Sequence, residues 1–120
     1  MKQMKVLIVD DNEKIRALVR DYLPASFDQI SECADGADAL RCYEANRPDW
    51  VLMDWEMPIM NGITATREII AEFPRANICM VTAFKDEELR HAALSAGARG
   101  FVMKNRLLEL ETILDSDLKH

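Results

Sequence analysis

The feature that most constrains the fold is an alternation, five times along the 120 residues, between a short apolar run and a segment with helical spacing. The apolar runs are nearly continuous, which is typical of strands that are covered on both faces in a parallel sheet. The runs span Lys5–Asp10, Gln29–Cys33, Asp49–Asp54, Asn77–Thr82 and Arg99–Met103. Ser31 and Glu32 interrupt the second run, so it has the composition of an edge strand.

The segments between and after these runs carry apolar residues on one helical face. In the first of them Ile15, Leu18 and Val19 share such a face, and Pro24 ends the helix. A strand–helix unit that recurs five times, with right-handed crossovers, predicts an α/β fold with helices on both faces of a parallel sheet. We expect one domain over residues 1–120.

Composition excludes several classes of function. The net charge of −6 argues against direct binding to nucleic acid, which usually needs a basic face. No apolar run approaches the roughly 20 residues of a membrane helix. The first strand begins too early for a secretory signal. The spacing of Cys33, Cys42 and Cys79 matches no zinc or redox motif, so we expect reduced thiols in a cytoplasmic protein that makes no membrane contact.

Residues that carry chemistry follow the predicted strands. The first strand ends in Asp10 and Asp11, the third in Asp54 and the fourth in Thr82, and the fifth runs into Lys104. Ligands of open α/β sheets bind beyond the carboxyl ends of the strands. We therefore expect three carboxylates, a hydroxyl and an ammonium group at one edge of the sheet.

Each of these residues also has an ordinary structural interpretation. Asp11 or Asn12 would cap the first helix, Thr82 suits a turn, and a lysine after a strand is usually a solvated end. Together, however, three carboxylates repel one another unless a cation is present. Mg²⁺ takes oxygen ligands and commonly pairs with phosphate, so the group predicts a magnesium site beside a site for an anionic group.

With these residues at the ends of its predicted strands, the sequence resembles the receiver domains of two-component response regulators. Four blocks carry the resemblance in order and spacing along essentially the whole chain: "VLIVDDN", "DWEMPIMNG", "MVTAF" and "GARGFVMK". The resemblance implies a doubly wound, flavodoxin-like (βα)5 fold with strand order 2-1-3-4-5.

The resemblance also implies roles for the site. Asp54 is expected to accept a phosphoryl group from phosphohistidine, with Mg²⁺ bound directly by Asp11, through water by Asp10, and also by Asp54 and the backbone carbonyl of Glu56. Lys104 is expected to pair with the phosphoryl group once it has formed.

A second set of implied roles concerns switching. Thr82 is expected to hydrogen-bond the phosphoryl group, and Phe101 to change rotamer with it. These movements would alter the face made by the fourth helix, fifth strand and fifth helix. Glu56 and Phe84 would flank the path of the water that hydrolyses the acyl phosphate.

Two positions depart from common family patterns. Asn105 follows Lys104 where proline is frequent, so the loop after the fifth strand is expected to differ. Phe101 lacks the hydroxyl of the tyrosine often found at its position.

The implied partners are a histidine kinase or histidine phosphotransfer protein, a downstream effector or a fused output domain, and a second copy of the chain in a homodimer that forms on phosphorylation. The protein would be a signalling switch rather than an enzyme.

Three alternatives remain open. It could be the receiver portion of a longer DNA-binding regulator. A haloacid-dehalogenase-type phosphatase would need an Asp-x-Asp pattern after the first strand, where the sequence has Asp10-Asp11-Asn12. A flavodoxin-like ligand binder would need a glycine- or hydroxyl-rich phosphate loop there.

Overall fold

The computed structural model describes residues 4–83 and 85–118, and in this part of the chain the five predicted strands form one parallel sheet in the order β2-β1-β3-β4-β5. The strands are β1 (Met4–Val9), β2 (Phe27–Cys33), β3 (Trp50–Asp54), β4 (Ile78–Thr82) and β5 (Gly100–Met103). The α/β class and the strand order predicted from the sequence are thus confirmed.

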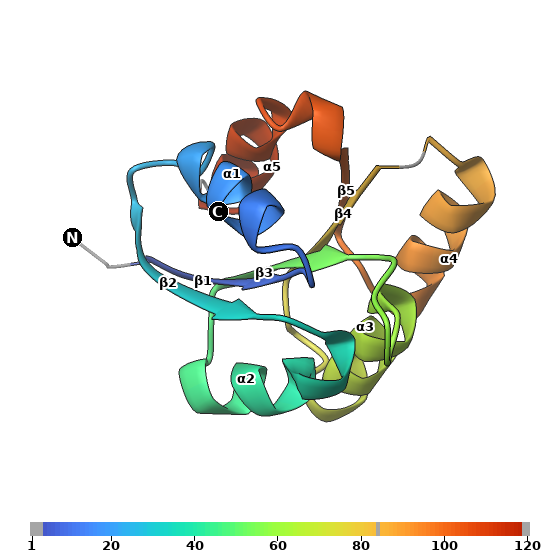
Figure 1. The fold of residues 1–120 in the computed structure, drawn as a ribbon. Coiled ribbons are helices and arrows are strands. Elements are labelled where there is room, and N and C mark those ends of the chain that lie inside the picture. The colour runs from blue at the N-terminus through green and yellow to red at the C-terminus, as the bar shows by residue number, and fades with distance from the viewer. Residues whose placement is uncertain (1–3, 84, 119–120) are drawn as a thin grey trace.

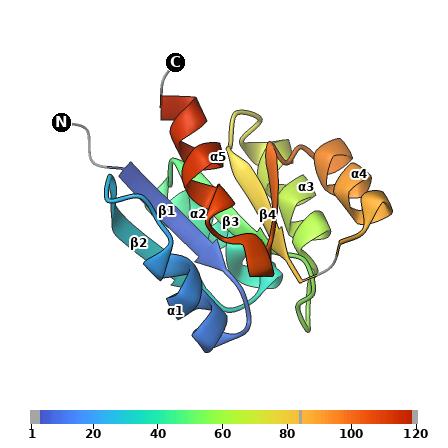
Figure 2. The same cartoon turned by 90° about the horizontal axis from the view of Figure 1, so that it is seen from above.

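Helices cover both faces of this sheet (Figure 1). They are α1 (Glu13–Asp21), α2 (Ala39–Asn46), α3 (Gly62–Glu72), α4 (Glu87–Ala96) and α5 (Glu109–Leu118), with two short 3-10 helices, η1 (Gly36–Asp38) and η2 (Lys104–Arg106). Helices α1 and α5 pack on one face, and α2, α3 and α4 pack on the other, as the view from above also shows (Figure 2).

Burial along the strands explains why the apolar runs predicted the sheet so well. Every residue of β3 and β4 is buried, because these strands lie in the interior of the sheet under helices on both sides. Strand β2 has only Phe27 and Cys33 buried, which confirms its prediction as an edge strand.

Helix ends differ from the expected ones by a few residues. Helix α1 ends at Asp21, before the predicted stop at Pro24. Between β5 and α5 the chain forms the 3-10 helix η2 around Asn105, so α5 begins only at Glu109. Every peptide bond of the described residues is trans.

The structure describes most of the single domain expected over residues 1–120. Residues 1–3, Phe84 and residues 119–120 lie outside the described part of the chain.

Candidate functional site

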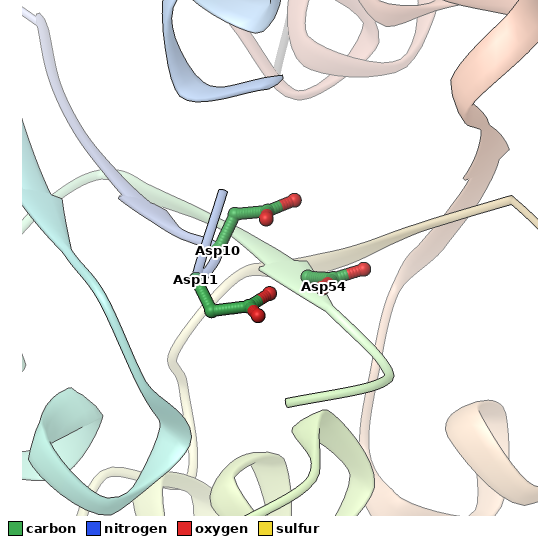
Figure 3. A group of neighbouring side chains, drawn as sticks. All are labelled: Asp10, Asp11 and Asp54. Carbon is green, nitrogen blue, oxygen red and sulfur yellow. The ribbon is translucent and has the colours of Figure 1, made fainter. Parts of the chain in front are cut away.

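The carboxylates predicted to cluster lie together at the carboxyl edge of the sheet (Figure 3). Strands β1 and β3 are neighbours, so Asp10, which follows β1, lies beside Asp54, the last residue of β3. One carboxylate oxygen from each of Asp10, Asp11 and Asp54 lies within 4.8 Å of the others. The three carboxylates therefore lie together at one edge of the sheet, and their roles stay predictions.

Lys104 completes the cluster from the end of β5. Its Nζ lies 3.1 Å from Asp10 Oδ2 and 3.0 Å from Asp54 Oδ1, so one ammonium group bridges two buried carboxylates. Burial alone lowers the pKa of Lys104, but its contacts with Asp54 and Asp10 outweigh that effect and raise the pKa above its usual value. The ammonium group is therefore charged at neutral pH.

The position of Asp54 is electrostatically costly. It is only 5% exposed, and burial raises its pKa to about 6, with the negative charge of Asp10 adding to this effect and Lys104 opposing it. A carboxylate that resists ionisation in spite of a lysine partner is a group that a further cation would stabilise. The arrangement fits a hard divalent ion, because Asp10, Asp11 and Asp54 each offer a carboxylate oxygen as a metal ligand.

The start of α1 settles which residue caps it. Asn12 Oδ1 accepts the N–H groups of Lys14 and Ile15, so Asn12 is the cap and Asp11 is not. The Asn12 N–H in turn donates to Asp10 Oδ1 at 2.8 Å. Asp11 is exposed, and its carboxylate belongs to the cluster.

An open pocket of about 350 Å³ surrounds these groups. Its lining residues are Asp10, Asp11, Asn12, Asp54, Glu56, Ala83 and Lys104. Glu56 is exposed at its wall, as expected for a residue two positions after the end of β3. The pocket is wide enough for a small anion and is open to a partner molecule.

The two residues predicted to act as a switch lie outside this lining. Thr82 ends β4, one strand beyond Asp54, and is buried. Phe101 lies in β5 opposite Met80, is half-buried and packs against the core on the α2–α4 face. Phe84, predicted to flank the water path, lies outside the described residues.

Two further residues support the site and were not predicted from the sequence. Arg16, on α1, donates from Nη1 to the backbone carbonyl of Asp10 at 2.6 Å and pairs through Nε with Glu32 on β2 at 2.8 Å. Asp35, after β2, accepts backbone N–H groups from the loop that follows β3. The contacts of Asp35 join segments 24 and 25 residues apart in the chain, and only an Asp-Gly turn signal marks Asp35 in the sequence.

Comparison with known proteins gives a consistent picture. The family profile of the response regulator receiver domain matches residues 6–115. The chemotaxis protein CheY of Halobacterium salinarum is 41% identical over 100 residues, which are 83% of this chain and 83% of that protein. The uncharacterized transcriptional regulatory protein YhcZ of Bacillus subtilis is 39% identical over 85% of this chain, but the match covers only 49% of that relative's length.

Solved structures agree with the sequence matches. A two-component response regulator of the LuxR family from Aurantimonas sp. SI85-9A1 is 30% identical with a TM-score of 0.91, over 98% of this chain and 86% of that one. The receiver domain of the histidine kinase CKI1 from Arabidopsis thaliana, complexed with Mg²⁺, is 27% identical with a TM-score of 0.82, over 95% of this chain and 91% of that one.

No helix in the described part of this chain is both long and apolar enough to span a bilayer.

Proposed function

The chain belongs to the family of response regulator receiver domains, and on that premise we propose that it is a phospho-accepting switch whose acceptor is Asp54. The observation that carries the proposal is the buried Asp54 carboxylate, held 3.0 Å from Lys104 and within 4.8 Å of carboxylate oxygens of Asp10 and Asp11. A phosphoryl group spreads about two negative charges over three oxygens, so it needs positive charge at the acceptor.

The transfer step is a nucleophilic displacement. An Asp54 carboxylate oxygen forms a bond to the phosphorus of a phosphohistidine, while the bond between phosphorus and the imidazole nitrogen breaks and leaves its electron pair on nitrogen. The product is an acyl phosphate on Asp54. The pKa of about 6 leaves the Asp54 carboxylate mostly ionised at pH 7.5, even without a metal ion.

Mg²⁺ fits the donors around Asp54. Asp11 and Asp54 would hold it directly, Asp10 through water, and the Glu56 backbone carbonyl would add an oxygen. When bound, the ion offsets negative charge on the phosphoryl oxygens.

Lys104 and Thr82 would act on the phosphorylated form. Because Lys104 already bridges Asp10 and Asp54, it would exchange a carboxylate partner for a phosphoryl oxygen without leaving the pocket. The Thr82 hydroxyl, at the end of the adjacent β4, would donate to another phosphoryl oxygen. In this state the chain is a switch that assists its own phosphorylation and dephosphorylation rather than an enzyme with a free substrate.

The output surface would be the face formed by α4, β5 and α5. Phe101, on β5, would rotate as Thr82 moves toward the phosphoryl group, so that phosphorylation favours one of two pre-existing states. Arg90, His91 and Leu94 are exposed on α4 and are candidates for contacts with an effector or a second copy of the chain. Amide exchange that changes on phosphorylation at these residues, as well as around Asp54, is the expected result.

The phosphodonor protein would approach from the side of α1 and the segment after β5. A groove of about 230 Å³ there is lined by Leu18, Tyr22, Lys104, Asn105, Arg106, Leu107 and Leu108. Leu18, Tyr22 and Leu108 are exposed apolar side chains, and the groove reaches Lys104 in the acidic pocket. An apolar surface that reaches Lys104, the ion-pair partner of Asp54, suits a donor that must bring phosphohistidine to Asp54.

The relatives support two contexts for this domain. The match covers 83% of CheY from H. salinarum but about half of YhcZ, a transcriptional regulatory protein. We propose a receiver over residues 1–120, either acting alone or serving as the receiver portion of a longer DNA-binding regulator. The length of the open reading frame that encodes residues 1–120 distinguishes a receiver that acts alone from one that is part of a longer regulator. The phosphatase alternative predicts turnover of free phosphomonoesters, which we do not expect.

The central experiment is incubation with acetyl phosphate and Mg²⁺, followed by intact mass. Wild type is expected to gain one phosphoryl group and Asp54→Asn none, because an amide is not a nucleophile toward phosphorus. Asp38→Asn makes the same change of charge at an exposed carboxylate whose partner is Arg41, so it should react like wild type. Phosphorylation of Asp54→Asn at the same site would contradict the assignment of the acceptor.

A further inference from the structure

A buried carboxylate outside the acidic pocket ties together two loops at the carboxyl edge of the sheet. Asp35 lies two residues after β2 and is only 7% exposed. Its Oδ1 accepts the N–H of Ala37 at 2.9 Å and that of Met60 at 3.1 Å, and its Oδ2 accepts the N–H of Ile59 at 3.1 Å. Ile59 and Met60 belong to the loop between β3 and α3.

These donors keep Asp35 ionised. Burial alone raises its pKa, but the backbone N–H groups around it outweigh that effect and hold the pKa below its usual value. The next residue shows how closely the two loops approach: a Cβ on Gly36 would lie 2.3 Å from the carbonyl oxygen of Met60. The contact between the loops is therefore direct and specific, and is not a chance surface approach.

The loop that Asp35 holds is the one that leads out of the acidic pocket. It is also fixed at its helix end, where the N–H of Gly62 donates to the carbonyl of Trp55 at 2.7 Å and a Cβ on Gly62 would lie 2.0 Å from the Asp54 carbonyl oxygen. Glu56 lies between these anchors and three residues before Ile59. Asp35 therefore limits the positions that the Glu56 backbone can adopt.

We propose that Asp35 is a positioning residue for the cation site: by holding Ile59 and Met60, it restricts the Glu56 backbone to positions beside the pocket that Asp10, Asp11 and Asp54 line, and so raises the affinity for Mg²⁺. The inference rests on the proposed function, because it concerns the same site. Groups that orient metal ligands typically change metal affinity by about 10–100-fold when they are removed.

The alternative is that Asp35 only stabilises the fold by capping η1 through Ala37. Asp35→Ser separates the two roles. A serine hydroxyl retains the capping function, but with one oxygen on a shorter side chain it lacks the second acceptor that holds Ile59. Asp35→Asn keeps the size of the side chain and replaces one oxygen with a donor. Asp38→Asn, at an exposed carboxylate three residues on, is the matched control for charge.

The experiment is a calorimetric titration with Mg²⁺, combined with amide hydrogen exchange at Ile59 and Met60. Asp35→Ser and Asp35→Asn are expected to bind Mg²⁺ about tenfold more weakly than wild type. Their Ile59 and Met60 amides should exchange faster, while Asp38→Asn should match wild type in both measurements. A folded Asp35→Ser protein with wild-type affinity for Mg²⁺ would overturn the proposal, since a merely stabilising residue would not alter affinity in the folded state.

Two further outcomes are distinguishable. If the variants do not fold, wild type alone provides the test. Mg²⁺ should slow amide hydrogen exchange at Ile59 and Met60. Unchanged exchange on Mg²⁺ binding would overturn the proposed link between the loop that Asp35 holds and the cation site. A wild-type protein that does not bind Mg²⁺ would overturn the proposed function and, with it, the role of Asp35 in that function.

Discussion

The two loops on either side of the acidic pocket are anchored in different ways. The loop from Trp55 to Asn61 is held by the buried Asp35 at one point and by the close approach of Gly62 to Asp54 at another. The segment after β5 is held by Lys104 at its start and by the buried Leu107, with Asn105, Arg106 and Leu108 exposed. One loop is built for fixed geometry, and the other presents a surface.

This difference suggests a division of labour. The proposed cation site would need ligands within a narrow range of positions, which would account for the dense anchoring of the loop that carries Glu56. The proposed donor surface would need exposed side chains, and the aliphatic Leu108 is 79% exposed.

The strongest test of the fixed loop is Gly62→Ala. The added Cβ would lie 2.0 Å from the Asp54 carbonyl oxygen, and backbone cannot move aside as a flexible side chain can. We expect the free energy of unfolding to fall by about 3 kcal/mol. The measurement is the midpoint of urea unfolding, interpreted at unchanged m value.

Gly100→Ala is the control for this substitution. Its Cβ would meet side-chain atoms of Ile113 at 3.0 Å and Cys79 at 3.1 Å, which can shift. We expect a loss of about 1 kcal/mol. Equal losses in the two variants would show that the loop after Asp54 yields more readily than the geometry indicates.

The second prediction concerns the electrostatic cost of the acidic pocket. Asp54 has a pKa of about 6 in the folded protein, above the roughly 3.9 of an unfolded chain. Between these values the folded state binds more protons than the unfolded state. The free energy of unfolding therefore falls as pH rises through this window and levels off above the folded pKa.

Asp54→Asn removes this titration. Without Mg²⁺ we expect the variant to be more stable than wild type at pH 8 by about 1–3 kcal/mol, at 1.4 kcal/mol for each pKa unit. At pH 4 the gain should shrink toward zero, and Mg²⁺ should stabilise only wild type. The check is urea unfolding at both pH values, with Asp38→Asn as control. If the variant gained equal stability at pH 4 and pH 8, the gain would not come from removing the charge of Asp54.

The extent to which the sequence predicted this site follows from the physics of its parts. Strand ends can be located from apolar runs, so the amino-acid sequence alone places Asp10, Asp54 and Lys104 at one edge of the sheet. Arg16 and Asp35 could not be placed in this way. Arg16 bonds a backbone carbonyl six residues away, at Asp10, and Asp35 accepts backbone N–H groups of a distant loop, and backbone groups carry no sequence signal. The roles of Thr82 and Phe101 in switching remain predictions, since they concern a second conformation.

A substitution in the exposed segment after β5 is expected to have the smallest effect. Leu108→Ser removes apolar surface from the groove that reaches Lys104, and stability should change by no more than about 0.5 kcal/mol because the side chain is solvated. We expect phosphotransfer from a purified phosphorylated histidine phosphotransfer protein to slow by about fivefold, which is ~1 kcal/mol in the barrier. Phosphorylation by acetyl phosphate should keep its wild-type rate, because a small donor does not need this surface.

Ile59→Ser is the matched control, since Ile59 is as exposed as Leu108, at 79%, but lies on the anchored loop. If the groove at Leu108 receives the donor, Ile59→Ser should transfer phosphate at close to the wild-type rate. A greater loss in Ile59→Ser than in Leu108→Ser would place the donor over the loop held by Asp35. The anchoring of that loop would then serve recognition as well as metal geometry, and the two loops would no longer divide the work between them.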